Sequence, residues 1–252
     1  MLKYKIESCE EFISFTKNIK NMFENSDMLV HDARNQIKVL KTDDVEVVVK
    51  AYKIPSLFNK IVYTFFRKPK AYRAYHNAMK LCEMGINTAK AYSYICFYKY
   101  FLLDKSYFIS QKVDYDLTMK QVFDNDHIEN HDDILISFGE FAKTLHDKHI
   151  EHKDFSPGNI LVKKNQTSYI FTIIDINRMN FQMMNFEQKM QNLCKLWTSE
   201  KNLKLIAYGY CIDNQFDEKT VYESISFNNR RDKEKKYMKK KFKILLGLYK
   251  EA

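Results

Sequence analysis

Hydrophobic positions alternate along the first half of the chain and recur at helical spacing in the second half. Residues 31–40 and 44–52 are rich in β-branched side chains, and residues 91–101 and 106–113 alternate like the two strands of a hairpin. Over residues 134–148 the apolar positions repeat every three or four residues, which predicts a helix. Strands that precede helices in this way favour an α+β chain with two lobes, a small antiparallel sheet followed by a helical part.

Other segments complete the predicted order. Residues 10–23 and 70–84 read as helices, the second ended by Gly85 at its C-terminus. A further helix is expected to begin within 117–123, and others after Met183, through Trp197 and at the C-terminus. Residues 55–69, directly before the helix predicted over residues 70–84, form a basic and aromatic insertion.

A short polar loop carries the clearest chemical signal. Residues 152–159 read His-Lys-Asp-Phe-Ser-Pro-Gly-Asn, so Asp154 precedes Asn159 by five residues. Residues 160–162 then predict a strand, 163–168 a polar turn and 169–174 a second strand that ends at Asp175. Phosphoryl transfer uses a carboxylate that orients a hydroxyl, together with an amide and a carboxylate that hold Mg²⁺ on a nucleotide. We therefore take Asp154 as the candidate base and Asn159 and Asp175 as candidate metal ligands.

Lys50 lies at the end of the β-branched run Val45–Tyr52, about a hundred residues before that loop. A lysine at the end of such a strand is usually a surface residue. In kinases, however, a strand lysine contacts the α- and β-phosphates. Its position ahead of the Asp154 loop favours this second interpretation.

Bulk properties exclude several classes of protein. The chain has 252 residues, 45% of them hydrophobic, and few Gly or Pro, which is typical of one large or one two-lobed domain. No apolar run is long enough to span a membrane, and the N-terminus lacks the apolar core of a secretion signal. The five cysteines are scattered without a Cys-x-x-Cys pair, which indicates reduced thiols rather than zinc ligands or disulfides. We expect a cytoplasmic protein.

The net charge of +9 is concentrated near the C-terminus. Residues Arg230–Lys243 include nine basic and two acidic side chains, and apolar residues among them suggest a basic amphipathic helix. Such a stretch binds anionic lipid headgroups or nucleic acid, or is simply a solvated helix face. Peripheral contact with the anionic inner-membrane surface is the better match if the substrate is a lipid, and no nucleic acid is expected.

Taken together, these segments resemble the protein-kinase-like superfamily and, within it, the lipopolysaccharide kinases of the Kdo kinase and WaaP group. The resemblance covers about residues 31–180 and includes Arg67-Lys-Pro-Lys-Ala71, Gly85-Ile-Asn-Thr88, Leu145-His146, the 152–159 loop and Ile174-Asp-Ile-Asn-Arg178. It implies an N-lobe over residues 1–110, a C-lobe over residues 111–252 and a hinge near residues 111–115.

The resemblance also implies an activity: transfer of phosphate from ATP, with Mg²⁺, to a sugar hydroxyl (Kdo or heptose) of the lipopolysaccharide inner core. On that basis Lys50 holds phosphates, Asp154 orients the sugar hydroxyl, and Asn159 and Asp175 bind Mg²⁺. The acceptor that the resemblance implies is a lipid-linked sugar.

Three departures from the family pattern affect the expected site. No glycine-rich loop is present, so we expect the backbone around Ala33–Asn35 to contact phosphates, with Arg34 and Asn35 as candidate nucleotide-binding residues. The helix after Lys70 lacks the usual acidic partner for Lys50, which leaves Asp175 or phosphate alone as its partner. Asn177 stands where many relatives carry a second Asp, and Arg178 is either structural or faces the substrate.

Two other functions stay open at this point. A kinase of small molecules such as aminoglycosides, or a minimal protein kinase, would use the same loop. A pseudokinase scaffold would account for the missing glycine loop and the missing acidic residue. The short segment after Asp175 disfavours a protein kinase, since it leaves little room for a peptide-docking platform.

Overall fold

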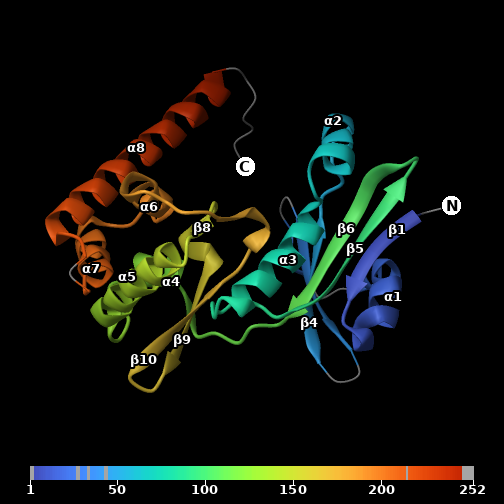
Figure 1. Ribbon diagram of the computed structural model, residues 1–252, viewed down its shortest axis with the longest axis horizontal. Coiled ribbons are helices and arrows are strands. Elements are labelled where there is room, and N and C mark those ends of the chain that lie inside the picture. The colour runs from blue at the N-terminus through green and yellow to red at the C-terminus, as the bar shows by residue number, and fades with distance from the viewer. Residues whose placement is uncertain (1–2, 27–28, 33–34, 43–44, 214, 246–252) are drawn as a thin grey trace. The chain divides into compact units, whose positions relative to one another are not determined.

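A computed structural model describes residues 3–26, 29–32, 35–42, 45–213 and 215–245 (Figure 1). The chain divides into two compact units. The first contains Met1–Asp114 and Thr172–Arg178, and the second contains Tyr115–Phe171 and Met179–Ala252. The lobe boundaries expected from the sequence, 1–110 and 111–252, stay a prediction.

The first unit is built on a six-stranded antiparallel sheet with the order β1-β5-β6-β4-β3-β2. Its strands are β1 (Lys3–Ser8), β2 (Leu29–Asp32), β3 (Gln36–Lys41), β4 (Glu46–Tyr52), β5 (Ala91–Lys99) and β6 (Leu102–Gln111). The prediction of one strand over 31–40 is wrong, because β2 and β3 are two strands paired at Asp32 and Gln36. Asp32 and Asn35, at the junction of the two strands, are residue types with low strand propensity.

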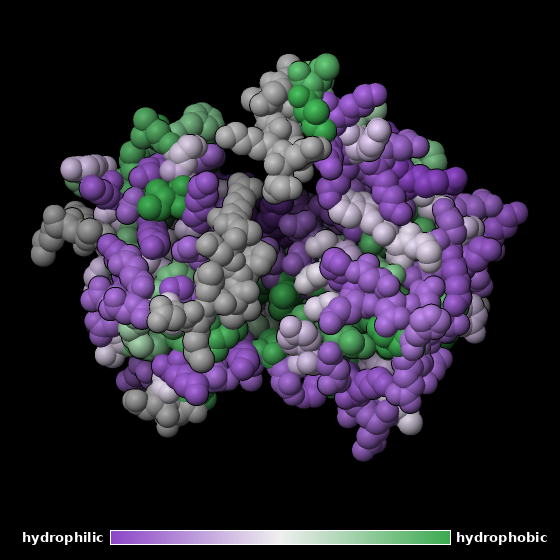
Figure 2. All heavy atoms as spheres, turned by 180° about the vertical axis from the view of Figure 1, so that it is seen from behind, coloured by the Kyte–Doolittle hydropathy of each residue, from purple (hydrophilic) through white to green (hydrophobic). Residues whose placement is uncertain are grey.

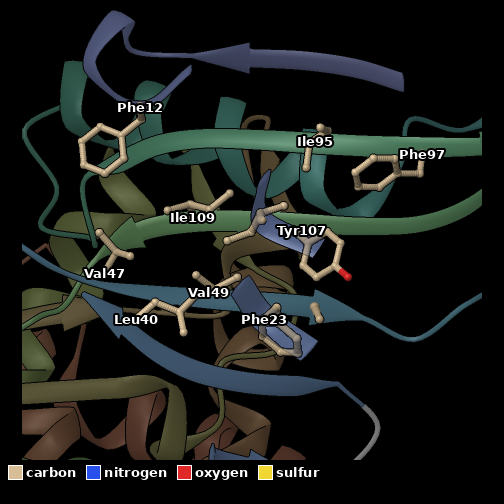
Figure 3. Close-up of a cluster of buried hydrophobic side chains, with 11 residues drawn as sticks. Phe12, Phe23, Leu40, Val47, Val49, Ile95, Phe97, Tyr107 and Ile109 are labelled. Atoms are coloured by element: carbon tan, nitrogen blue, oxygen red, sulfur yellow. The ribbon is translucent and has the colours of Figure 1, made fainter. Parts of the chain in front are cut away.

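Helices cover both faces of this sheet. The short helix η1 (Glu10–Phe12) and helix α1 (Ile13–Glu24) bury Phe12, Ile19 and Phe23 in a core that includes Ile95 of β5 (Figure 3). The neighbouring Tyr94 instead contacts rings of helix α3 (Lys70–Glu83). Because successive strand side chains point to opposite faces, α1 and α3 lie on opposite sides of the sheet. Helix α3 ends before Gly85, whose φ of 69° is the left-handed conformation expected of a C-terminal glycine.

The insertion over residues 55–69 is helical. It forms α2 (Leu57–Ile61) and a π-helical turn, η2 (Val62–Phe66), placed between β4 and α3 along the chain. These two elements are called the α2–η2 segment below.

The second unit is mainly helical. Its helices are α4 (Met119–Asp124), α5 (His131–Asp147), α6 (Phe186–Asn192), α7 (Glu200–Tyr210) and α8 (Glu218–Leu245), with short turns η3 (Pro157–Asn159) and η5 (Leu193–Lys195). The predicted helix at 134–148 is therefore confirmed as α5, whereas Trp197 lies outside any helix with a φ of 47°.

Short strands complete this part of the chain. β7 (Leu117–Thr118), β9 (Ile160–Asn165) and β10 (Ser168–Ile173) form a three-stranded sheet, and β8 (Ile150–His152) pairs with β11 (Met179–Phe181). The β9–β10 hairpin is confirmed, but its turn is shorter than the predicted 163–168, because β9 continues to Asn165 and Gln166 takes the left-handed conformation.

Candidate active site

Lys50 and Asp175 form an ion pair in the first unit. The side chains of Val47, Val49 and Ala51 on β4 point into the core under α1, so Lys50 projects from the opposite face of the sheet. Its Nζ lies 2.6 Å from Oδ1 of Asp175, and the two side chains are only 13% and 29% exposed. Of the two partners expected for Lys50, Asp175 or phosphate alone, the structure gives Asp175.

Helix α3 holds the backbone around Asp175. Arg73 donates a hydrogen bond to the carbonyl of Asn177 at 2.8 Å, and Asn77 donates one to the carbonyl of Ile176 at 2.7 Å. Thr88 binds the carbonyl of Ile173 at 2.8 Å. These contacts keep Asp175 in its left-handed conformation, with a φ of 55°. The helix that lacks an acidic partner for Lys50 thus positions the residue that takes over this role.

Asn177 and Tyr52 complete the surroundings of Asp175. The Asn177 amide donates a hydrogen bond to Oδ1 of Asp175, the same oxygen that contacts Lys50. Burial, with a contribution from the negative charge of Asp175, raises the pKa of Tyr52 well above its ordinary value, so this phenol stays protonated. Asn177 therefore supports the carboxylate as a hydrogen-bond donor, where a second Asp would repel it.

The loop that carries Asp154 is fixed by its own backbone. The N–H of Asp154 donates to Nδ1 of the buried His152 at 3.1 Å, and the carbonyl of Asp154 accepts from the N–H of Ser156 at 2.7 Å. Phe155 is fully buried and stacks on Phe138 of α5 with ring centroids 5.8 Å apart. These backbone and ring contacts fix the conformation of the loop that carries the Asp154 carboxylate.

Asn159 closes the same loop. Its Nδ2 donates to the carbonyl of Asp154 at 2.9 Å, so the amide oxygen is the atom left to act as a ligand. An amide oxygen from Asn159 and a carboxylate from Asp175 are oxygen ligands of the kind that Mg²⁺ takes from proteins when phosphate and water supply the rest. Both predicted metal ligands thus fit Mg²⁺ chemically.

Lys195 is a site residue that the sequence did not reveal. It lies at the end of η5, with its Nζ 3.7 Å from Oδ1 of Asp154 and 2.6 Å from the carbonyl of Lys153. Its position forty-one residues after Asp154 follows no local motif, and only the fold brings it to the loop.

Arg34 and Asn35 are the two remaining nucleotide-binding candidates, and their role stays a prediction. Asn35 is described, and its side-chain oxygen accepts a long hydrogen bond of 3.4 Å from the N–H of Lys53. Arg34 lies outside the described residues. The structure thus brings Lys50 to Asp175 and Asp154 to Asn159, and the gathering of all four around one nucleotide stays a prediction.

A chain of hydrogen bonds through the half-buried Asn192 and the buried His146 and Tyr210 supports the Asp154 loop. Asn192 donates to the carbonyl of His152 at 3.0 Å, which directs its amide oxygen toward Nε2 of His146 at 3.2 Å. Nδ1 of His146 therefore accepts from the hydroxyl of Tyr210 at 2.9 Å. Burial lowers the pKa of His146 from 6.5 to about 4, so this imidazole is neutral in the folded protein.

Acid is therefore expected to destabilise the fold through His146. Because its pKa is lower in the folded state than in the unfolded state, the unfolded chain binds more protons between these two values, and stability falls as the pH drops through this range. The loss should reach about 2 kcal/mol between about pH 7.5 and about pH 5. Urea unfolding at both pH values measures it.

The matched comparison uses two substitutions. His146→Gln should remove this part of the pH dependence, whereas His127→Gln, at an exposed histidine, should retain it. Equal pH dependence in the wild type and in His146→Gln would contradict the assignment.

The fold is that of a kinase-like protein. A search of solved structures finds "WaaP in complex with acyl carrier protein", with a TM-score of 0.64 and 10% identity, covering 91% of this chain and 98% of that one. At this identity the likeness shows the fold, and it confirms the two-lobed kinase-like class. No curated protein matches the sequence.

The profile of the lipopolysaccharide kinase (Kdo/WaaP) family matches residues 31–219, well over half of the chain. The chain belongs to this family, which confirms the resemblance derived from the sequence. It is therefore an ATP-dependent kinase of an alcohol acceptor in lipopolysaccharide, and the scaffold interpretation is not retained.

Proposed function

We propose that this kinase phosphorylates a hydroxyl of Kdo or heptose in the inner core of lipopolysaccharide, with Mg²⁺ as cofactor. The observation that carries the proposal is the pairing of Lys50 with Asp175 at 2.6 Å, because a strand lysine next to a strand-end carboxylate is the pair that handles phosphates and metal in kinases. The family match supports the substrate class.

Each residue has a separate task in the proposed reaction. Lys50 binds the phosphates of ATP, and Asp175 and Asn159 would hold Mg²⁺, which when bound would neutralise charge on the transferred phosphoryl group. Asp154 accepts a hydrogen bond from the sugar hydroxyl and takes its proton as the oxygen attacks the γ-phosphorus. The bond from that phosphorus to the bridging oxygen breaks, and ADP leaves. Lys195 places a positive charge beside Asp154, where the acceptor hydroxyl loses its proton.

The acceptor can be identified by direct phosphate transfer. Radiolabelled ATP and Mg²⁺ are incubated with Kdo-lipid A, with heptose-extended Kdo-lipid A, with an aminoglycoside and with a peptide, each in separate reactions. We expect label on a lipid-linked sugar in the wild type and its loss in Asp154→Ala. Label on the aminoglycoside or the peptide alone would reject the proposed substrate and favour one of the other kinase classes.

The basic end of α8 is proposed as a contact with an anionic membrane surface. Its described apolar side chains Tyr237, Met238, Phe242, Ile244 and Leu245 are all exposed, and lysines stand among them, since Lys240 follows Tyr237 by three residues and precedes Ile244 by four. Apolar and basic positions are intermixed around this end of α8, so the amphipathic helix expected there is not supported, and the proposed contact depends on exposed apolar side chains next to lysines. Within the described residues, no helix combines the length and apolar character needed to cross a bilayer.

A further inference from the structure

The α2–η2 segment exposes an unusual set of large apolar side chains. Leu57 is 70% exposed, Phe58 76%, Phe65 67% and Phe66 82%, and Ile61 is also exposed. Burying one such side chain is worth about 1.5–3 kcal/mol, so leaving several of them in water on one short segment is costly. Figure 2 shows hydrophobic side chains gathered at the upper left, over the end of the first unit that carries α2. An exposed patch of this kind marks an interaction surface.

The segment is firmly attached to the sheet. Oγ1 of Thr64 accepts a hydrogen bond from the N–H of Leu103 at 2.9 Å, and Lys60 pairs with Asp104 at 3.1 Å. Both partners lie at the start of β6, next to the tip of the β5–β6 hairpin, where Tyr100 and Phe101 are 84% and 78% exposed. The hairpin tip therefore adds two aromatic side chains beside the segment.

Basic residues surround these apolar side chains. Residues 51–70 contain no acidic residue and include five basic ones, at positions 53, 60, 67, 68 and 70. Arg67 and Lys68 are exposed and directly follow Phe66. Apolar side chains that enter the headgroup region, with basic residues around them, are the features by which proteins bind the surface of an anionic bilayer.

Charge also argues against a second copy of the chain as the occupant. Two α2–η2 segments in contact would bring together two clusters of positive charge, which repel each other. An anionic lipid surface complements the same charge, and basic residues near it contribute about 1 kcal/mol each.

We propose that the α2–η2 segment docks this kinase onto an anionic phospholipid bilayer, with Leu57, Phe58, Phe65 and Phe66 entering the headgroup region. The proposal deepens the proposed function and rests on it only in that a lipid-linked acceptor lies in a membrane. Docking places the enzyme on the surface that holds its acceptor and raises the local concentration of that acceptor.

Vesicle co-sedimentation tests the proposal. The full-length protein is mixed with phosphatidylcholine vesicles that contain or lack phosphatidylglycerol, without ATP or lipopolysaccharide. We expect the wild type to sediment with the anionic vesicles, and the Phe58→Ser/Phe66→Ser variant to bind them about 10–100-fold more weakly. Arg67→Gln/Lys68→Gln should weaken binding less and remove much of its dependence on phosphatidylglycerol.

Matched variants control for general effects. Met183→Ser/Ile212→Ser removes two exposed apolar side chains elsewhere, and Lys17→Gln/Lys20→Gln removes two exposed charges from α1. Both should bind like the wild type, and thermal melts check that every variant is folded. Lys239→Gln/Lys241→Gln reports separately on the basic end of α8.

Several results would overturn the proposal. One is that the Phe58→Ser/Phe66→Ser variant binds anionic vesicles as tightly as the wild type, whether or not the α8 variant loses binding. The segment would instead be assigned to a protein partner if the wild type fails to bind vesicles but forms a concentration-dependent dimer or captures acyl carrier protein. In that case the same substitutions should abolish the dimer or the capture. The vesicle experiment contains no acceptor, so its result does not depend on whether the acceptor assay is positive or negative. The docking proposal and the proposed substrate can therefore be rejected independently of each other.

Discussion

Replacing Asp154 with asparagine is expected to lower kcat by about 10²–10⁴-fold, since a positioned general base contributes this much. The two side chains have the same shape, but asparagine cannot accept the proton of the sugar hydroxyl. The fold should survive, because the loop is held by the backbone N–H and carbonyl of residue 154 and by the buried ring of Phe155. Steady-state phosphate transfer to the lipid-linked acceptor measures the loss.

Two comparisons make this result specific. The thermal melting temperature of Asp154→Asn should match that of the wild type, which separates lost chemistry from lost folding. Lys195→Met should lower kcat by a smaller factor, because Lys195 acts on the reacting groups through its charge 3.7 Å from Asp154. A wild-type kcat for Asp154→Asn would remove Asp154 from the mechanism.

The second large effect concerns stability. Gly209→Ala is expected to cost about 3 kcal/mol or more and to lower the melting temperature by about 10 °C. Helices α5 and α7 approach so closely that a Cβ on Gly209 would lie 1.9 Å from the carbonyl oxygen of Ile136. On the facing helix, a Cβ on Gly139 would lie 2.3 Å from the carbonyl oxygen of Ile206. Because the obstructing atoms belong to the backbone, the two helices must separate to admit the methyl group.

Gly158→Ala is the matched control. A Cβ there would meet no atom within 4 Å, so the same substitution should leave the melting temperature unchanged. If Gly209→Ala unfolds at the wild-type temperature, α5 and α7 are not packed as closely as their backbones indicate.

Much of the fold follows from patterns that span only a few residues. The β-branched run before Lys50, the apolar spacing of α5 and the glycine after α3 are local signals, and each element is present. The division of residues 31–40 between β2 and β3 was missed because the strand-like character of this stretch outweighed its polar residues. Helix α7 was not predicted as a separate element, since it follows the non-helical Trp197 after only two residues.

Some residues of the candidate site could likewise be predicted from local patterns, and others could not. Asp154 and Asn159 stand within one loop, so their relation could be predicted from spacing alone. Lys195, Arg73 and Asn77 could not, because their partners lie 41, 104 and 99 residues away in the sequence and are met only through the packing of helices. The pairing of Lys50 with Asp175 was one of two open alternatives, and only tertiary structure could choose between them.

The hydrogen bonds from α3 to the carbonyls of Ile176 and Asn177 hold Asp175 where it pairs with Lys50. This matters when distant relatives are classified as active or inactive kinases from their sequences. A sequence criterion that requires a glutamate on this helix would classify the present chain as inactive, although a carboxylate from another part of the sequence contacts the lysine. Surveys of such enzymes would do better to ask whether any acidic side chain meets the strand lysine in space than whether one stands at a fixed position in an alignment.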